Sequence, residues 1–266
     1  MDIKNKTILV TGASSGLGYE IAIQLATNHH SNLVIVARRE EKLEILKAQI
    51  LNKTNVNVTI LAADLSIAAD NQKVIDHCLS LPGFSGAILN AGVTHFGRHL
   101  QLEWEDFQKM MDVNIISVVK MTNSFIQHFE NNNNEGRVMI VSSMASLFPV
   151  PYQAAYSGTK GFLTNFANAL SQEINNPKLS LTVFCPGGIK TEMTDGDKFS
   201  SLSKWLEPVG HVAKEGIYAF LKGKSTYVPG KLNKLSVIIF KLLPRSFVLK
   251  QTGKIYRKAI DEHKKA

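Results

Sequence analysis

The sequence predicts a doubly wound α/β fold, in which a parallel seven-stranded sheet carries helices on both faces and a C-terminal helical extension follows. Three observations predict it. Seven short runs rich in Val, Ile and Leu alternate with longer amphipathic stretches. The short runs are apolar almost throughout, which is typical of strands that are covered on both faces. A glycine-rich segment directly follows the first run.

The expected strands and helices alternate along the chain, and right-handed crossovers then place the strands in one sheet. No stretch rich in Pro, Gly and Ser divides the chain, so residues 1–230 are expected to form one domain. The strands are expected at residues 7–10, 33–37, 56–62, 86–90, 137–142, 180–184 and 226–228. The helices are expected at residues 16–28, 40–52, 67–79, 103–129, 154–174 and 209–221.

The net charge of +8 is distributed unevenly along the 266 residues. Residues 222–266 hold 12 Lys and Arg and two acidic residues, giving +10, whereas residues 1–221 hold 18 basic and 20 acidic residues, giving −2. Because the body is nearly neutral, the charge does not predict a nucleic-acid-binding face.

The two cysteines, Cys78 and Cys185, lie far apart and predict neither a metal site nor a disulfide framework. Isolated thiols are typical of a reducing compartment. The chain leaves no room for a signal peptide before the first strand, and no apolar run approaches the ~18 residues of a spanning helix. A cytoplasmic protein is therefore expected.

Residues 11–18, Thr-Gly-Ala-Ser-Ser-Gly-Leu-Gly, connect the first strand to the first helix and are called the glycine turn below. Glycines at this position let the backbone approach a pyrophosphate, which then faces the N–H groups and dipole of the helix. The alternative interpretation is a tight turn without a ligand. The expected cofactor-binding residues of this segment are Gly12, Ser14, Ser15, Gly16, Leu17 and Gly18.

The second strand ends with Arg38 and Arg39, and the next carboxylate is Glu40. A guanidinium suits a 2′-phosphate, whereas a carboxylate would suit a free ribose hydroxyl, so NADP(H) is favoured over NAD(H). The alternative is a solvated charge pair at the start of a helix. Asp64, at the end of the third strand, is expected to bind the adenine amine or to cap the next helix.

Tyr156 and Lys160 lie four residues apart on an expected helix and so share a face. A neighbouring ammonium favours the phenolate form of a tyrosine, whose ordinary pKa of about 10 hinders proton exchange at neutral pH. The alternative is a common pair on a helix surface. The fifth strand ends at Ser142 and Ser143, where an open α/β sheet binds its ligand.

Taken together with Asn90-Ala91-Gly92, Asn114 and Pro186-Gly187, these segments resemble the short-chain dehydrogenase/reductase family in order and spacing over residues 5–230. The resemblance implies a single-domain Rossmann fold and hydride transfer with a nicotinamide cofactor. It implies that Tyr156 is the general acid, that Lys160 lowers the pKa of Tyr156 and binds the nicotinamide ribose, that Ser143 orients the carbonyl, and that Asn114 holds a water in a proton relay.

The resemblance also implies further cofactor contacts. Asn90 would brace its strand against the cofactor, Asp64 and Leu65 would lie at the adenine, and Thr191 would lie near the pyrophosphate. The glycine turn departs from many NADP-preferring members, because Ser14 and Ser15 stand where those carry a basic residue. Arg38 would then be the main ligand of the 2′-phosphate, with Ser14 as a helper and with moderate selectivity. The remaining expected cofactor contacts are Arg39, Ala91, Gly92, Tyr156, Lys160, Pro186, Gly187 and Ile189.

Residues 188–207 are polar and contain glycine, and they are expected to form a lid over the nicotinamide. An apolar pocket would favour a small hydrophobic carbonyl or alcohol substrate. The alternative for each expected wall residue is ordinary core packing. The expected wall residues are Phe96, Met144, Phe148, Val150, Met193 and Trp205.

These observations favour an NADP(H)-dependent oxidoreductase of a hydrophobic ketone or aldehyde and its alcohol. Two alternatives stay open. One is a reductase of a carrier-bound 3-oxoacyl group, and the other is a non-enzymatic NADP-binding scaffold or sensor that acts through the C-terminal extension. The resemblance also implies a homodimer or homotetramer that pairs the helices at 103–130 and 154–175.

The basic extension, residues 231–266, carries apolar residues at helical spacing on both sides of Pro244 and Lys or Arg on the other face. Three interpretations are open. It packs on the same domain over the substrate pocket, or against a neighbouring subunit. It lies on an anionic membrane surface as a peripheral element, where apolar burial and charge attraction add. It docks to an acidic carrier protein.

Overall fold

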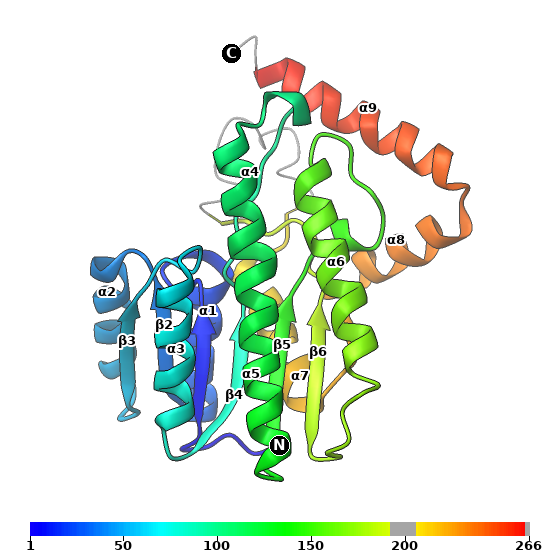
Figure 1. Cartoon of the computed structure of the whole chain (residues 1–266). Helices are drawn as coiled ribbons and strands as arrows, with labels where there is room; N and C mark the ends of the chain where they lie inside the picture. Colours follow the sequence, from blue (N-terminus) through cyan, green and yellow to red (C-terminus); the bar gives the residue numbers. More distant parts are fainter. Residues whose placement is uncertain (192–205, 264–266) are drawn as a thin grey trace.

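Seven parallel strands form the sheet, and their order is β3-β2-β1-β4-β5-β6-β7 (Figure 1). The computed structural model describes residues 1–191 and 206–263, with side chains up to residue 260. This parallel seven-stranded sheet confirms the predicted fold class. The strands are β1 (Thr7–Thr11), β2 (Asn32–Ala37), β3 (Val58–Ala62), β4 (Phe84–Leu89), β5 (Gly136–Val141), β6 (Leu179–Phe184) and β7 (Thr226–Tyr227).

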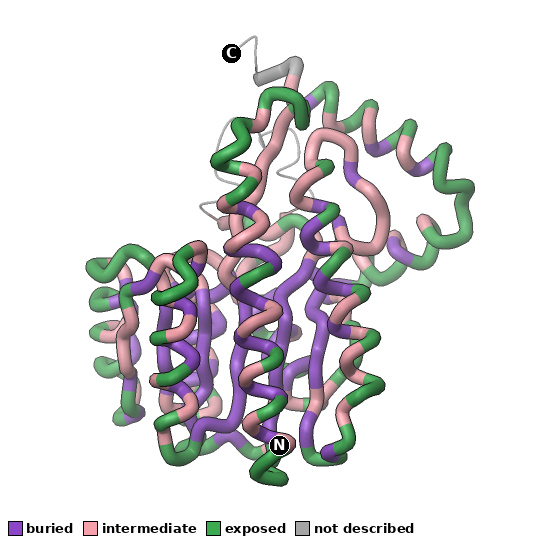
Figure 2. The backbone as a smooth tube through the Cα atoms, viewed as in Figure 1, coloured by how far each residue is buried: buried purple, intermediate pink, exposed green. Residues whose placement is uncertain are grey.

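Helices cover both faces of this sheet, and each face has its own apolar core (Figures 1 and 2). The side chains of α1, α2 and α7 pack on one face, and those of α3, α5 and α6 pack on the other. The strands between them are buried along most of their length because both of their faces are covered. These helices are α1 (Gly16–His29), α2 (Glu40–Leu51), α3 (Ala68–Ser80), α5 (Ser117–Asn131), α6 (Ala154–Leu170) and α7 (Val209–Lys222).

The helix expected at residues 103–129 is one continuous rod with a wider turn inside it. α4 (Trp104–Met111) leads into a π-helical turn, η2 (Asp112–Ile116), which leads into α5. Such turns are rare in proteins, and those that occur often lie at functional sites. The periodicity predicted the rod but not this turn.

The strand order reverses between β1 and β4, because β2 and β3 lie on one side of β1 and β4 to β7 on the other. In sheets of this kind, ligands bind in the crevice at the carboxyl ends of the strands beside this reversal. The glycine turn leaves β1 at this crevice, and residues 90–94 leave β4 beside it.

The C-terminal extension forms two helices, α8 (Lys231–Leu242) and α9 (Arg245–His263), with Pro244 in the turn between them. Proline cannot continue the hydrogen bonding of α8, so the helix ends just before it. Figure 1 shows α8 leaving the body and α9 returning across the end of the molecule where the carboxyl ends of the strands lie. Within residues 1–191 and 206–263, no helix is long and apolar enough to cross a bilayer.

Candidate active site

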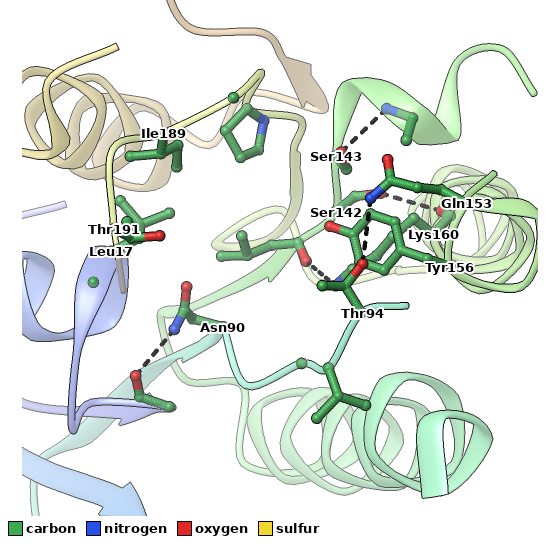
Figure 3. Close-up of a pocket in the computed structure, with 18 of the residues that line it drawn as sticks. Leu17, Asn90, Thr94, Ser142, Ser143, Gln153, Tyr156, Lys160, Ile189 and Thr191 are labelled. Carbon is green, nitrogen blue, oxygen red and sulfur yellow. Dashed lines mark hydrogen bonds between the residues drawn. The ribbon is translucent and has the colours of Figure 1, made fainter. Parts of the chain in front are cut away.

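A cavity of about 940 Å³ lies at the carboxyl ends of the strands, beside the reversal of strand order. It extends from the glycine turn, past the ends of β4 and β5, to α8 and α9. Figure 3 shows Leu17 and Asn90 on one side of it and Ser143, Tyr156 and Lys160 on the other. Residues that are far apart in the sequence, from the glycine turn to α9, therefore face one space.

The glycine turn has the shape of a phosphate cradle. A Cβ atom on Gly12, whose φ is +67°, would lie 2.9 Å from the Ala91 Cα atom, and one on Gly18 would collide with the Gly12 carbonyl oxygen. Ser15 is the N-cap of α1 but makes no side-chain cap hydrogen bond. The first N–H groups of α1 are therefore left to a ligand at the cavity, which is how helix N-termini hold a pyrophosphate. This turn fits a dinucleotide.

Gly18 is the one expected cofactor-binding residue of the glycine turn that does not line the cavity; the other five do. Its Cβ position is filled by the Gly12 carbonyl and by the side chain of Asn90. Gly18 thus allows close packing between the turn and the neighbouring strand end. Asn90 donates from Nδ2 to the carbonyl oxygens of Thr11 at 3.1 Å and Gly12 at 3.3 Å, so it braces β4 against the turn itself.

At the far end of the cavity, Arg39 reaches the glycine turn. Its Nη2 atom donates to the hydroxyl oxygens of Ser14 at 3.1 Å and Ser15 at 3.2 Å. Arg38 instead lies beside Asp64, with 3.9 Å between Nη1 and Oδ2. Both arginines line the cavity. Arg39, not Arg38, is thus the arginine held beside Ser14, and the expected role of Arg38 as the main 2′-phosphate ligand stays a prediction.

Asp64 receives hydrogen bonds on Oδ1 from the backbone N–H of Ser66 at 3.0 Å and from its hydroxyl at 2.7 Å. Burial raises the pKa of Asp64, but these bonds and the charges of Lys109 and Arg38 outweigh burial and lower it overall. The N-cap of α3 is Ile67, so the alternative of Asp64 as a helix cap is wrong. Asp64 is a carboxylate at the cavity wall.

The remaining expected cofactor contacts all line the cavity. Ala91 and Gly92 follow β4, and a Cβ atom on Gly92 would lie 3.3 Å from the Lys160 Nζ atom. Thr191 packs within 3.2 Å of the Cβ position of Gly16, which places the segment after β6 against the glycine turn. The others are Leu65, Pro186, Gly187 and Ile189.

Ser143, Tyr156 and Lys160 meet at the end of β5. Ser143 follows that strand, and its Oγ atom accepts from the backbone N–H of Ala145 at 3.1 Å, which fixes the side chain. Tyr156 and Lys160 lie one turn apart on α6, with the Lys160 Nζ atom 5.8 Å from the centre of the Tyr156 ring. The Ser143 hydroxyl is near enough to the Tyr156 phenol to lower its pKa. The structure thus brings together three residues that sequence spacing alone could only suggest.

Burial controls the electrostatics of this group. Burial raises the pKa of Tyr156, although the Ser143 side chain lowers it in part, and burial lowers the pKa of Lys160 to about 8. The expectation that Lys160 would lower the pKa of Tyr156 is not met here, because desolvation of the phenolate is the largest effect. Lys160 Nζ donates to the Val141 carbonyl oxygen at 2.9 Å. Because burial raises the pKa of Tyr156 above its ordinary value, this side chain is a neutral phenol at neutral pH.

Asn114 lies in the π-helical turn and is fully buried. Its amide makes a two-way pair with the backbone of Val93, accepting from the N–H and donating to the carbonyl, each at 2.9 Å. It also donates to the Thr159 hydroxyl at 3.1 Å. Asn114 thus connects the segment after β4 with α6, directly behind Lys160, and does not itself line the cavity.

The expected substrate walls are only partly described. Met144, Phe148 and Val150 line the cavity. Met193 and Trp205 lie outside the described residues, as do residues 192–205 of the segment that was expected to form a lid. The two described ends of that segment are paired, because the Lys190 N–H donates to the Glu207 carbonyl oxygen at 3.1 Å. Phe96 does not line the cavity; it packs on Tyr256, 5.6 Å between ring centres.

The C-terminal helices wall the cavity, in agreement with the interpretation that the extension packs over the substrate pocket, but sequence reasoning did not name the residues that face it. Phe240 of α8 packs edge-on against Phe148 at 4.9 Å, and Tyr256 of α9 lies in the cavity with the pKa of its phenol raised by burial. Gln153, one turn before Tyr156, donates to the Thr94 hydroxyl at 3.4 Å (Figure 3). The helical spacing around Pro244 predicted the helices but not which of their residues face inward.

A parallel sheet with a phosphate-cradling glycine turn at its strand-order reversal defines a Rossmann-type dinucleotide-binding protein. The sequence model of one family, described as short chain dehydrogenase, matches residues 6–199. This chain belongs to the short-chain dehydrogenase family.

Relatives and a solved structure agree with that family. An 11-beta-hydroxysteroid dehydrogenase from Pinus massoniana is 32% identical over 197 residues, covering 73% of this chain and 54% of the relative. A very-long-chain 3-oxoacyl-CoA reductase from Scheffersomyces stipitis is 32% identical over 182 residues, covering 65% and 52%. The chain thus spans about half the length of these curated relatives. A short-chain dehydrogenase from Sphingobium yanoikuyae in complex with NADPH has the same fold, with 22% identity, coverage of 85% and 88%, and a TM-score of 0.76.

Proposed function

We propose that this chain is an NADP(H)-dependent oxidoreductase that interconverts a hydrophobic ketone or aldehyde and its alcohol. The observation that carries the proposal is the shared cavity. A phosphate cradle lies at one end, and a serine, a tyrosine and a lysine lie together further along it. A non-enzymatic scaffold or sensor would have no use for this second group.

Each polar group at the end of β5 has a distinct task in this proposal. Tyr156 gives its phenolic proton to the carbonyl oxygen, while the Ser143 hydroxyl donates to the same oxygen and stabilises the charge that develops on it. Lys160 orients the ribose next to Tyr156 and supplies positive charge beside the phenol. Asn114 holds the segment after β4 and α6 in register. When bound, the nicotinamide supplies or accepts the hydride at the substrate carbon.

The raised pKa of Tyr156 suits the reducing direction. A phenol that stays protonated through neutral pH is ready to act as an acid, whereas the oxidising direction needs the phenolate. A ribose bound against Lys160 would exclude water from its ammonium group. The protonation states of Tyr156 and Lys160 are therefore set in the complex with the cofactor.

The preference for NADP(H) rests on the two arginines at the far end of the cavity. Arg39 is held on the hydroxyls of Ser14 and Ser15, and Arg38 lies across from it at the Asp64 carboxylate. A 2′-phosphate placed between two guanidinium groups would gain charge-assisted hydrogen bonds that a ribose hydroxyl cannot supply. The Asp64 carboxylate repels that phosphate in part, so the preference for NADP(H) over NAD(H) is moderate.

The substrate class rests on the apolar part of the cavity. Phe148 and Phe240 form one wall, and Met144, Val150 and Tyr256 extend it. Such a lining favours an apolar substrate with a single polar group aimed at Tyr156.

Tyr156→Phe tests the proposal. We expect the variant to lose turnover of a panel of ketones and aldehydes by at least about a thousandfold, a barrier increase of about 4 kcal/mol. NADPH binding, followed by the fluorescence of the reduced nicotinamide, should stay within about twofold. Tyr218→Phe, an exposed tyrosine on α7, is the matched control and should keep full activity. Near-normal turnover in Tyr156→Phe would refute the assignment.

A second candidate substrate is a 3-oxoacyl thioester on a carrier such as coenzyme A. A second cavity of about 590 Å³ lies between the loop after β4, the loop before α6 and α9. Arg98, Lys250, Lys254 and Arg257 line it, and none of its lining residues is acidic. This lining suits a carrier phosphate. A faster rate on a 3-oxoacyl thioester than on the matched free ketone would favour this candidate.

We also propose a cytoplasmic homodimer or homotetramer that pairs residues 103–130 and 154–175. Ile116 and Phe162 are large apolar side chains that these helices expose, at 58% and 47%. Phe162 stacks on Phe166 along the same helix face. Light scattering at micromolar concentration should give two or four chains, and Phe162→Lys should give monomers.

A further inference from the structure

The C-terminal helices present an unusual amount of apolar surface to solvent. Of sixteen exposed large apolar residues among those with described side chains, eight lie between residues 232 and 255. Single exposed apolar residues are ordinary on a protein surface, but a cluster marks an interaction site. The eighth, Ile255, lines the cavity. The other seven are called the outer face below: Leu232, Leu235, Ile238, Ile239, Leu242, Leu243 and Phe247.

The outer face is not needed to hold the helices on the body. Val237 of α8 and Val248 of α9 are buried, and Phe240 and Tyr256 line the cavity, so the opposite side of each helix makes the contacts with the domain. Leu242 is 80% exposed and Ile238 is 56% exposed. Figure 2 shows the turn between α8 and α9 as an exposed region that projects from the domain. Each helix therefore has an inner side that packs on the domain and an outer side that is available to a partner.

The charge around the outer face selects the kind of partner. Residues 231–260 contain eight Lys and Arg and no Asp or Glu. Four of them line the two cavities and Lys234 pairs with Glu215, so three remain for the outer face. Lys231, Lys241 and Arg245 are exposed and lie next to or between residues of the apolar cluster in the sequence, and they are called its basic rim below. A second copy of this chain, seated on the same face, would bring two such basic rims together, which like-charge repulsion disfavours. A surface that is both apolar and anionic matches the cluster and its rim.

We propose that the outer face docks on an anionic phospholipid bilayer, with the apolar side chains of α8 at the boundary of headgroups and acyl chains and the basic rim at the phosphates. Amphipathic helices bind in this way, and their affinity adds apolar burial to charge attraction. Because the inner side of the same helices walls the substrate cavity, docking brings that wall next to the lipid.

Vesicle flotation tests the proposal with the full chain. We expect binding to vesicles of equal parts phosphatidylglycerol and phosphatidylcholine, and at least about tenfold weaker binding to pure phosphatidylcholine. Raised salt should weaken binding to the anionic vesicles, because screening reduces the attraction. The double variant Ile238→Gln, Leu242→Gln should lose at least about tenfold in affinity. Its matched control, Ile45→Gln, Ile67→Gln, removes exposed apolar residues elsewhere and should bind as wild type.

The charge contribution is tested separately. Lys241→Glu with Arg245→Glu should reduce affinity for the anionic vesicles by more than about twentyfold, since each basic residue near the surface contributes about fivefold. Lys53→Glu with Lys73→Glu carries the same net charge change on other helices and loops and should have less than about threefold effect. Turnover of a water-soluble ketone should be unchanged in all four variants, which verifies folding and keeps this proposal separate from the enzymatic one.

Three results would overturn the proposal. The first is absence of binding to the anionic vesicles. The second is equal binding to neutral and anionic vesicles. The third is a concentration-dependent dimer that Ile238→Gln, Leu242→Gln abolishes, which would assign the outer face to a second copy.

Discussion

Lys160→Met replaces a buried ammonium group by an apolar side chain of similar length. Lys160 is 4% exposed, and burial lowers its pKa to about 8 from an ordinary value of 10.5. Its Nζ atom donates to the Val141 carbonyl oxygen at 2.9 Å. We expect the variant to lose turnover, and yet to have a higher free energy of unfolding at pH 7 than the wild type.

The magnitude follows from the pKa of Lys160. Lowering the pKa of Lys160 from 10.5 to about 8 corresponds to about 3–4 kcal/mol of penalty for keeping the charge buried at pH 7. Losing the hydrogen bond to Val141 costs about 1.5–3 kcal/mol, so the variant should be more stable by about 0.5–2 kcal/mol.

The sign of the pH dependence is set by which state holds the proton. Between pH 8 and 10.5, unfolded Lys160 binds a proton that the folded form has released, so wild-type stability rises with pH in that window. The advantage of Lys160→Met should therefore shrink, by about 2 kcal/mol between pH 7 and 9.5. Burial raises the pKa of Tyr156, and also that of Cys185 despite hydrogen bonds and the Lys160 charge that lower it, so both groups favour their neutral forms.

Urea unfolding of both proteins at pH 7 and pH 9.5, followed by circular dichroism, measures the two differences. Lys214→Met, at an exposed lysine of α7, is the control and should show no pH-dependent difference from wild type. A difference between Lys160→Met and wild type that stays constant across the pH range would refute the buried ammonium.

Three further predictions concern other parts of the site. Arg39→Ala should weaken NADPH binding by about tenfold or more while changing NADH binding less than about twofold, and Arg38→Ala should follow it more weakly; equal losses for both cofactors in a titration would contradict a 2′-phosphate site. Gly18→Ala should lower the free energy of unfolding by about 1–3 kcal/mol in urea, because its Cβ would collide with the glycine turn. Gly158→Ala on α6 meets nothing within 4 Å and should instead raise that free energy by about 0.5–1 kcal/mol. Tyr256→Ala should raise KM for an apolar ketone by about tenfold with little change for a short aldehyde; parallel rises would show that Tyr256 does not shape the pocket.

Local patterns predicted the sheet and its helices well, because hydrophobic periodicity and turn formation depend on residues that are close together in the sequence. The apolar runs gave strands within a few residues of their bounds, and Pro244 marked the break between α8 and α9. The position of the glycine turn after β1 predicted the place of the cavity, because strand ends in a doubly wound sheet meet at one edge. Tyr156 and Lys160 were predicted to share a face from their spacing alone.

Other features depend on contacts between distant segments. The π-helical turn at Asp112–Ile116 accompanies the pairing of Asn114 with Val93, 21 residues away, which helical periodicity does not report. Arg39 donates to Ser14 and Arg38 lies beside Asp64, and the order of the two arginines in the sequence does not predict which partner each one reaches.

The sequence by itself therefore determined the fold, the edge of the sheet that binds a ligand, and the residue types available for proton transfer. Tertiary structure alone decided that Tyr256 walls the cavity, that burial raises the pKa of Tyr156, and that Leu242 faces solvent. The physical reason is range. Backbone preference and side-chain period act over a few residues, whereas desolvation and exposure depend on which distant segments pack around a group.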